Sequence, residues 1–280
     1  MLNELQKKEK FTLILAHLDH QLREDSEQET TLLSQYCHEH RLRLVNAKWP
    51  KDLQPQTGIE AAARAYRYSF LQTVMQKYHG DYLLTAHHGD DLLENILLKL
   101  IRSGYPEEMN SLQAVSKRQG MLLLRPLLSF SKKELLAYDR KHQLKFIEDQ
   151  TNFEDNTMRN RLRHYVVPLL KKENPQLLKN ALRFSNEENL LTNLANKNVR
   201  KIRQPEEFLR CSFRIKTDEL KSLPLEEQNY YWRNFIWQKW HRRVSDYFPG
   251  YHLIEYQGFI YLWPSKLRIN NEKSEIEVNK

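Results

Sequence analysis

The first 150 residues alternate short apolar runs with segments of helical periodicity, and this order constrains the fold more than any other feature. Segment 11–16 is a nearly continuous apolar run of strand length, which is typical of a strand buried on both faces of a parallel sheet. Further strands are predicted at 42–49, 82–86, 121–124 and 144–147, and helices at 26–40, 57–78, 90–101 and 131–143. Strands and helices in this alternation predict an α/β domain with an open, mostly parallel sheet.

The composition changes after about residue 155. Residues 159–172 contain arginines and lysines but no acidic residue. A long polar helix is predicted at 175–200, a strand at 208–215, an aromatic-rich helix at 225–240, and a hairpin at 251–263 that turns at Gln257–Gly258. We therefore expect an α/β catalytic domain at 1–157, a basic and mainly helical domain at 158–268, and a polar tail at 269–280.

Charge and composition exclude several classes of protein. The 280 residues include 44 Lys+Arg and 36 Asp+Glu, a formal net charge of +8, which moderately favours a nucleic-acid partner. No apolar run approaches the roughly 18 residues of a membrane span. Cys37 and Cys211 lie too far apart in sequence to indicate a disulfide framework or a zinc knuckle. The sequence predicts a cytoplasmic protein with no membrane association.

Glycine is scarce: the chain has 7, and no two lie closer than eight positions apart. A glycine-rich phosphate loop needs glycines close together, because the backbone must approach the phosphates without a Cβ between them. The sequence as written therefore contains neither a Walker A loop nor a dinucleotide fingerprint.

Ligands of open α/β sheets bind beyond the carboxyl ends of the strands, which directs attention to residues 17–20 and 87–91. If a helix begins near Gly89, Asp91 and Glu94 share one face of its first turns, where the helix dipole favours negative charge. An acidic helix cap, ligands of a divalent metal, and a site for a substrate ammonium group or for Mg²⁺ beside a nucleotide all fit this pattern.

Two arginine pairs have helical spacing. Arg64 and Arg67 project from one side of the helix at 57–78, which suits recognition of phosphate or carboxylate as well as a solvated surface. Arg159 and Arg163 share a face of a later helix, which suits either contact with a phosphate backbone or a solvent-exposed face. The aromatic helix at 225–240 could stack bases, but we expect it mainly to form the core of the second domain.

Several segments occur together in one order: 17–23 (HLDHQLR), 60–68 (EAAARAYRY), 85–94 (TAHHGDDLLE), 102–104 (RSG), 125–128 (RPLL), 149–152 (DQTN) and 159–164 (RNRLRH). In this combination the sequence resembles the tRNA(Ile)-lysidine synthetase family, a branch of the PP-loop ATP pyrophosphatases. The resemblance is strong over residues 11–172, and beyond residue 175 it concerns general organisation only. It implies an adenine nucleotide α-hydrolase-like sheet that is truncated at its N-terminus, followed by the second domain.

The resemblance implies a reaction at the wobble cytidine of tRNA(Ile) with a CAU anticodon. The cytosine C2 oxygen attacks the α-phosphate of ATP and releases pyrophosphate, and the amine of L-lysine then attacks C2, displaces AMP and leaves lysidine. This chemistry requires a cradle for the triphosphate, Mg²⁺ to offset its charge, and acidic groups to orient the lysine. ATP and Mg²⁺ are thus the implied cofactors.

The resemblance also implies roles for residues. The implied catalytic residues are His88, Asp91 and Glu94, of which Asp91 and Glu94 would hold the lysine. ATP would be bound by His17, Arg64, Arg67 and His87, and tRNA by Arg102, Asn152, Arg159, Asn160, Arg163, Lys171 and Lys172. Metal ligands are not assigned. A homodimer is compatible with the sequence, although no residue marks an interface.

The sequence departs from the family pattern at its start. Family members carry a Ser-Gly-Gly-x-Asp-Ser loop after a first strand, and here Met1 falls inside the helix expected to follow that loop. We therefore expect residues 1–280 alone to show no measurable adenylation and poor solubility, but to retain salt-sensitive tRNA binding through 159–172. The alternative is a catalytically inactive, truncated tRNA-binding remnant of the family. A tRNA thiolase fits less well, because the two cysteines do not form a pair, and a metal-dependent phosphohydrolase fits least.

Overall fold

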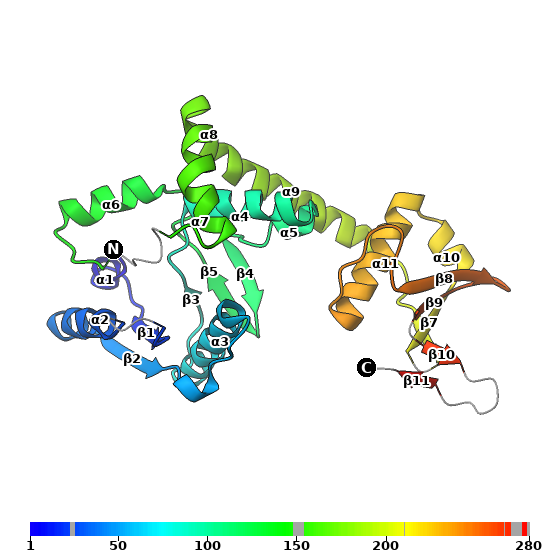
Figure 1. Ribbon diagram of the computed structural model, residues 1–280, viewed down its shortest axis with the longest axis horizontal. Helices are drawn as coiled ribbons and strands as arrows, with labels where there is room; N and C mark the ends of the chain where they lie inside the picture. Colours follow the sequence, from blue (N-terminus) through cyan, green and yellow to red (C-terminus); the bar gives the residue numbers. More distant parts are fainter. Residues whose placement is uncertain (23–25, 148–153, 210, 266, 270–275, 279–280) are drawn as a thin grey trace. The chain divides into compact units, whose positions relative to one another are not determined.

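The computed structural model describes residues 1–22, 26–147, 154–209, 211–265, 267–269 and 276–278. The chain forms two compact units, Met1–Glu188 and Asn189–Lys280, which meet within the long helix α9 (Leu177–Val199; Figure 1). This division lies later than the predicted one after residue 157. The reason is that Leu93, Val167 and Ala181 share one core, which ties the helices after residue 157 to the first unit.

The described residues of the first unit form five short strands. β1 (Ile14–Asp19) pairs in parallel with β2 (Arg43–Lys48), and β3 (Leu83–Leu84) pairs in parallel with β5 (Met121–Leu124). β4 (Val115–Arg118), which was not predicted, lies antiparallel to β5. The predicted α/β fold is confirmed. The strand expected at 144–147 is wrong, since these residues lie outside any strand or helix.

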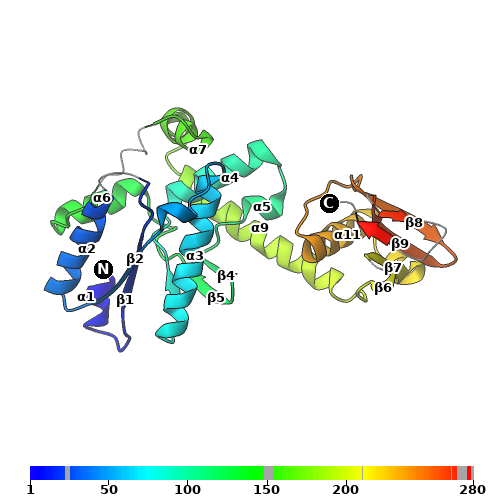
Figure 2. The same ribbon diagram turned by 60° about the horizontal axis from the view of Figure 1, so that its bottom comes forward.

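The parallel strands of the first unit belong to two separate sheets, β1–β2 and β3–β5–β4. In the described part of the chain, β1 pairs with β2 alone and β3 with β5 alone. Helix α3 (Ile59–Lys77) contacts β1 and also buries Tyr68 against Met121 and Leu123 of β5 (Figure 2). Among the described strands, β1 and β3 are therefore both edge strands of their sheets.

The remaining helices of the first unit are α1 (Leu2–Gln6), α2 (Glu27–Glu39), η1 (Lys51–Leu53), α4 (Gly89–Arg102), α5 (Pro106–Met109), α6 (Lys132–Lys141), α7 (Met158–Arg161), the π-helical turn η3 (Leu162–Val166) and α8 (Val167–Glu173). Helix α6 begins with a capping box: Ser131 Oγ accepts the Glu134 N–H at 3.1 Å, and the Glu134 carboxylate accepts the Ser131 N–H at 2.7 Å. Helix α3 begins two residues later than the predicted start at residue 57, because Gly58 precedes it with a φ of 68° and Thr57 lies outside the helix.

The second unit packs helices on an antiparallel sheet with the strand order β6–β7–β9–β8. The strands are β6 (Glu206–Leu209), β7 (Ser212–Lys216), β8 (Tyr251–Tyr256) and β9 (Phe259–Pro264), and the helices are α10 (Thr217–Lys221) and α11 (Leu225–Trp240). Tyr231, Trp232 and Ile236 of α11 are buried with Leu262 of β9, so the aromatic helix builds the core as expected. β10 (Leu267–Ile269) and β11 (Ile276–Val278) pair antiparallel.

The hairpin β8–β9 turns at Gln257 and Gly258, whose φ values are 47° and 77°. Two successive positive φ angles are what a two-residue turn between twisted strands requires. The predicted hairpin is therefore confirmed. No helix in the described residues combines the length and apolarity needed to cross a membrane.

Candidate active site

The site begins at the N-terminus of α4, just past the end of β3. His88 caps the helix: its backbone N–H donates to Asp91 Oδ2 at 3.0 Å, and its Nδ1 accepts the Asp91 N–H at 3.4 Å. The Gly89 N–H donates to the Phe130 carbonyl at 2.8 Å, and a Cβ on Gly89 would lie 3.1 Å from that oxygen. Glycine thus lets α4 begin directly against the 128–130 turn, which positions His88 and Asp91.

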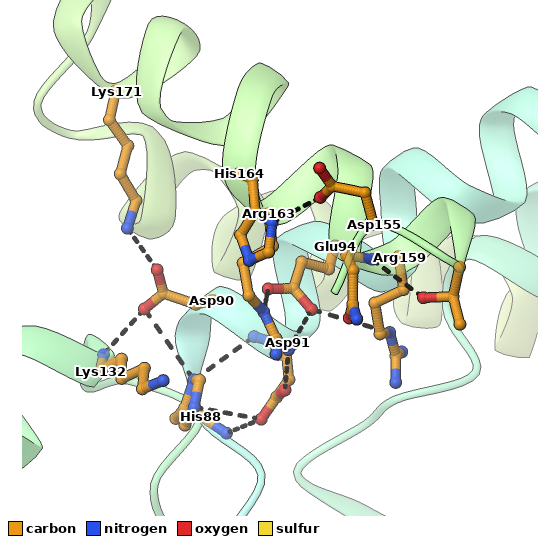
Figure 3. Close-up of polar contacts among 12 residues, drawn as sticks. His88, Asp90, Asp91, Glu94, Lys132, Asp155, Arg159, Arg163, His164 and Lys171 are labelled. Carbon is orange, nitrogen blue, oxygen red and sulfur yellow. Dashed lines mark hydrogen bonds and ion pairs between the residues drawn. The ribbon is translucent and has the colours of Figure 1, made fainter. Parts of the chain in front are cut away.

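Glu94 lies one turn further along α4 and is almost completely buried, with 1% of its side chain exposed. Arg163 donates two parallel hydrogen bonds to the Glu94 carboxylate, from Nε to Oε1 at 2.7 Å and from Nη2 to Oε2 at 2.8 Å (Figure 3). Arg159 Nε lies 3.7 Å from Glu94 Oε2. The hydrogen bonds that Arg163 donates to Glu94 also raise the pKa of Arg163. Glu94, predicted to bind lysine, therefore forms ion pairs with Arg163 and Arg159, both predicted to bind tRNA.

Asp91 is the more accessible of the two predicted lysine ligands. Its side chain is 18% exposed, and its Oδ1 lies 3.8 Å from Arg163 Nη2, beyond hydrogen-bonding distance. One Asp91 oxygen serves the helix cap, while the other faces the Glu94–Arg163 pair at longer range (Figure 3). Asp91 is therefore the carboxylate of this pair with free capacity to accept a hydrogen bond from a bound cation.

Arg163 is carried by the π-helical turn η3. Pro168 lies two residues after that turn, has no N–H to donate to the His164 carbonyl, and its ring would clash with that carbonyl in a regular α-helix. The backbone accommodates this by widening over Leu162–Val166. The sequence "RHYVVP" thus accounts for the local geometry that presents Arg163 to Glu94.

Asp90 ties the start of α4 to two other helices. It forms an ion pair with Lys171 of α8, and its Oδ2 accepts the Lys132 N–H of α6 at 2.8 Å (Figure 3). Burial acts to raise the pKa of Asp90, but the bonds to Lys171 and Lys132 outweigh it and leave the pKa lowered. Asp90 was not predicted as a site residue, and its partner Lys171 was predicted to bind tRNA. Lys172 is exposed on α8.

The segment before α7 is folded onto that helix. Asp155 Oδ1 lies 2.7 Å from His164 Nδ1, and Asp155 also accepts a hydrogen bond from Tyr165. Thr157 Oγ1 caps α7 by accepting the Asn160 N–H, and the Asn160 amide donates to the Glu154 carbonyl at 2.6 Å. Asn160 therefore fixes the local backbone. Asn152, also predicted to bind tRNA, lies outside the described residues.

His87 lies beside this cluster, between β3 and α4. Its Nδ1 is 2.8 Å from Thr85 Oγ1. Burial, together with the positive charges of Arg125, Arg64 and Arg159, lowers the pKa of His87 to about 4 against the opposing effect of Asp91. His87 is consequently a neutral imidazole at physiological pH.

This pKa makes a stability prediction. Since the pKa of His87 is lower in the folded chain than the usual 6.5, the unfolded chain binds more protons between about pH 6.5 and 4. The folded state should lose up to about 3 kcal/mol as the pH falls through that window, and His87→Asn should flatten this dependence. Urea unfolding at several pH values measures it, with the exposed His38→Asn as the control. Equal pH slopes for wild type and His87→Asn would contradict the prediction.

The arginines of α3 belong to a larger cationic group around Tyr68. The guanidinium groups of Arg118 and Arg64 lie 4.0 and 5.3 Å from the centre of the Tyr68 ring. Arg125, only 5% exposed, donates to the Gln113 carbonyl at 2.7 Å and to Ser116 Oγ at 2.8 Å. Burial, with Arg64 and Arg118, lowers the pKa of Arg125. Arg118 and Arg125 were not predicted as site residues, although Arg125 directly follows β5, where α/β sheets bind ligands.

Polar groups also collect at the carboxyl end of β1. His17 Nε2, Asp19 Oδ2 and His20 Nδ1 are buried without a hydrogen-bond partner among the described residues. Burial, and then the positive charge of Arg67, lowers the pKa of His20, which places Arg67 near this strand end. Such buried polar atoms call for a partner. Arg102, in contrast, is exposed at the far end of α4, a helix about 21 Å long.

Comparisons with known proteins agree with this arrangement. A family model described as a PP-loop domain matches residues 1–170. The tRNA(Ile)-lysidine synthase of Lactobacillus johnsonii is 53% identical over 83% of this chain and 54% of its own length. Those of Lactobacillus gasseri and Enterococcus faecalis are 51% and 39% identical, over 83% and 67% of this chain and 54% and 40% of their own lengths. The chain thus spans about half the length of the curated relatives it matches.

A solved structure has a similar fold. The U34-tRNA thiolase NcsA from Methanococcus maripaludis, with its 4Fe-4S cluster, aligns with a TM-score of 0.58 at 15% identity, over 66% of this chain and 64% of that one. The α/β unit and the charged groups at its strand ends define a domain of the PP-loop class. Within that class, the chain belongs to the tRNA(Ile)-lysidine synthase family.

Proposed function

We propose that this chain provides lysine-binding and tRNA-binding parts of a tRNA(Ile)-lysidine synthase. The reaction is ATP-dependent adenylation of the wobble cytidine of tRNA(Ile), followed by attack of lysine. The observation that carries the proposal is the Asp91 carboxylate, which is partly accessible beside the buried Glu94–Arg163 pair. The relatives of this name at 51–53% identity support it.

In the proposed site, Asp91 accepts hydrogen bonds from an ammonium group of lysine. Glu94 acts through Arg163 and does not contact lysine itself. Its two hydrogen bonds hold the Arg163 guanidinium beside Asp91, and this positions the Asp91 oxygen that accepts from lysine. This revises the direct lysine contact first expected of Glu94. His87, neutral near pH 7, can exchange a proton with the reacting base or the attacking amine.

ATP would bind between the open edges of β1 and β3. His17 and Arg67 approach this region from the β1 side, and His87 and Arg64 from the β3 side. In the family pattern, a strand and a Ser-Gly-Gly-x-Asp-Ser loop occupy the same region, and the loop's backbone N–H groups would hold the phosphates.

Mg²⁺ does not fit the protein residues alone. The described ranges contain no cluster of three His, Cys, Asp or Glu side chains that could hold a metal ion, and Asp90 and Glu94 are already engaged in ion pairs. A tRNA contact by Arg102 and Lys172, domain functions divided near residue 157, a homodimer and a cytoplasmic location remain predictions.

The test compares two proteins: this chain as written, and a loop-restored chain in which a strand and a Ser-Gly-Gly-x-Asp-Ser loop precede Met1. We expect the loop-restored chain to release pyrophosphate and incorporate labelled lysine only when tRNA(Ile) with a CAU anticodon, ATP and lysine are all present. The chain as written should do neither. The control is tRNA whose wobble base is uridine. Adenylation without any lysine incorporation would contradict the proposal, whereas tRNA binding without either step would favour the inactive remnant.

A further inference from the structure

The end of helix α11 carries an exposed surface that is both basic and aromatic. We call it the α11 corner, and it consists of Trp237, Lys239, His241, Arg242, Arg243 and Tyr247. All six residues are exposed, Tyr247 to 93% and Trp237 to 36%. Helix α11 ends at Trp240, and the chain turns at the C-cap residue His241, which has a left-handed φ of 53°.

The partners that the structure gives to the cations of the corner are mostly aromatic. Lys239 Nζ lies 4.8 Å from the centre of the Phe213 ring, and Arg242 hydrogen-bonds Tyr251. The one carboxylate of residues 237–247, Asp246, accepts a hydrogen bond from Arg233 at 2.7 Å. Because aromatic rings do not neutralise charge, Lys239 and Arg242 keep their positive charge available to an anionic partner.

Trp237 adds a flat apolar surface to this charge. The guanidinium of Arg243 lies over its ring at 4.0 Å, and the ring of His241 meets it edge-on at 5.6 Å. Tyr231 and Trp232 of α11 are buried in the core of the unit, and Tyr230, Phe235 and Trp240 pack against it, so the exposed Trp237 is not part of that core. Tryptophan with a stacked arginine is a surface on which an unpaired base can stack.

The basic segment at 159–172 of the first unit, predicted to bind tRNA, does not combine accessible cations with an exposed tryptophan in this way. Of the basic residues at 159–172, Arg159 and Arg163 approach Glu94, and Lys171 pairs with Asp90. These cations are compensated within the protein, so they contribute less to the affinity for a polyanion than their number suggests. Cations with aromatic partners, such as those of the α11 corner, contribute more.

We propose that the α11 corner is an RNA-binding surface of the second unit, which holds phosphates through Lys239 and Arg242 and stacks an unpaired base on Trp237. The inference rests on the proposed function, which supplies an RNA substrate, and it assigns part of the tRNA affinity to residues outside the basic segment at 159–172.

The test is filter binding of unmodified tRNA(Ile) to the full 280-residue chain across a range of salt concentrations. Lys239→Gln/Arg242→Gln should weaken binding and lower the slope of log K against log salt by about 1.5, as expected for two lost phosphate contacts. Lys216→Gln/Lys221→Gln is the matched control: it removes two exposed lysines of the same unit and should leave the slope unchanged. Equal slopes for both double variants would overturn the inference.

Trp237→Ala should weaken tRNA binding about tenfold with little change in the salt slope, and Trp237→Phe should restore most of the loss. Duplex DNA of equal length is the competitor that lacks unpaired bases. If Trp237→Ala weakens binding of both nucleic acids equally, base stacking on Trp237 is overturned. If the unchanged chain binds no tRNA at any salt concentration, both the proposed function and this inference are overturned. If all variants bind tRNA as the unchanged chain does, only the RNA-binding role of the α11 corner is overturned.

Discussion

Arg163→Met should lower the free energy of unfolding by about 3–5 kcal/mol, the cost of leaving a buried carboxylate without its partner. Glu94 is 1% exposed and accepts two short hydrogen bonds from Arg163. Arg159 cannot replace them from its present position, because its Nε lies 3.7 Å from Glu94 Oε2. Methionine retains much of the length of the arginine side chain, so the loss reflects the ion pair more than a cavity.

Urea unfolding of the chain measures this effect. Arg161→Met is the matched control: Arg161 is exposed two residues earlier and donates to the Asp155 carbonyl. We expect the control to change stability by less than about 1 kcal/mol. Adding Glu94→Gln to Arg163→Met should recover much of the loss, because an uncharged amide is far less costly to bury than a carboxylate. A loss for Arg163→Met no larger than that of Arg161→Met would contradict the prediction.

The elements with strong local signals could be predicted from the sequence. Helix α4 has a clear start at His88–Gly89 and an end at Ser103–Gly104, and the predicted helix at 90–101 matches it closely. Helix α11 occupies the predicted range 225–240. In both helices, local sequence preference and tertiary packing favour the same structure.

The weaker strands could not be predicted in the same way. β3 covers only Leu83–Leu84, although the apolar run suggests 82–86, because its length is set by pairing with β5 and not by its own sequence. The run at 144–147 is apolar in part but has no pairing partner among the described strands. Strand propensity therefore overestimates the length of a strand where pairing with a neighbouring strand determines which residues are extended.

The site shows the same limit. Asp91, Glu94, Arg159 and Arg163 were each selected as site residues, and the structure does bring them together. Their mutual pairing was not foreseen, since Glu94 and Arg163 are 69 residues apart and charge alone does not tell an internal ion pair from a ligand contact. Lys171 with Asp90 is a second example, at a separation of 81 residues.

Asp91→Asn in the loop-restored chain should reduce lysidine formation by a factor of about 10²–10³, while adenylation of tRNA(Ile) continues. The substitution is a clean one, because asparagine retains an oxygen that can accept the His88 N–H and so preserves the cap of α4. It removes the negative charge that would hold the lysine ammonium group. Glu94→Gln does not repeat the experiment, because it also removes the charge to which Arg163 donates two hydrogen bonds.

Two assays on the same samples separate the steps: transfer of labelled AMP to tRNA, and incorporation of labelled lysine. Asp52→Asn, a change at an exposed carboxylate in η1, is the control and should leave both unaffected. If Asp91 binds lysine, raising the lysine concentration should partly restore the second step in Asp91→Asn, since weakened binding can be offset by mass action. Loss of adenylation with lysine binding intact would instead assign Asp91 to the nucleotide, and the lysine site would have to lie elsewhere in the first unit.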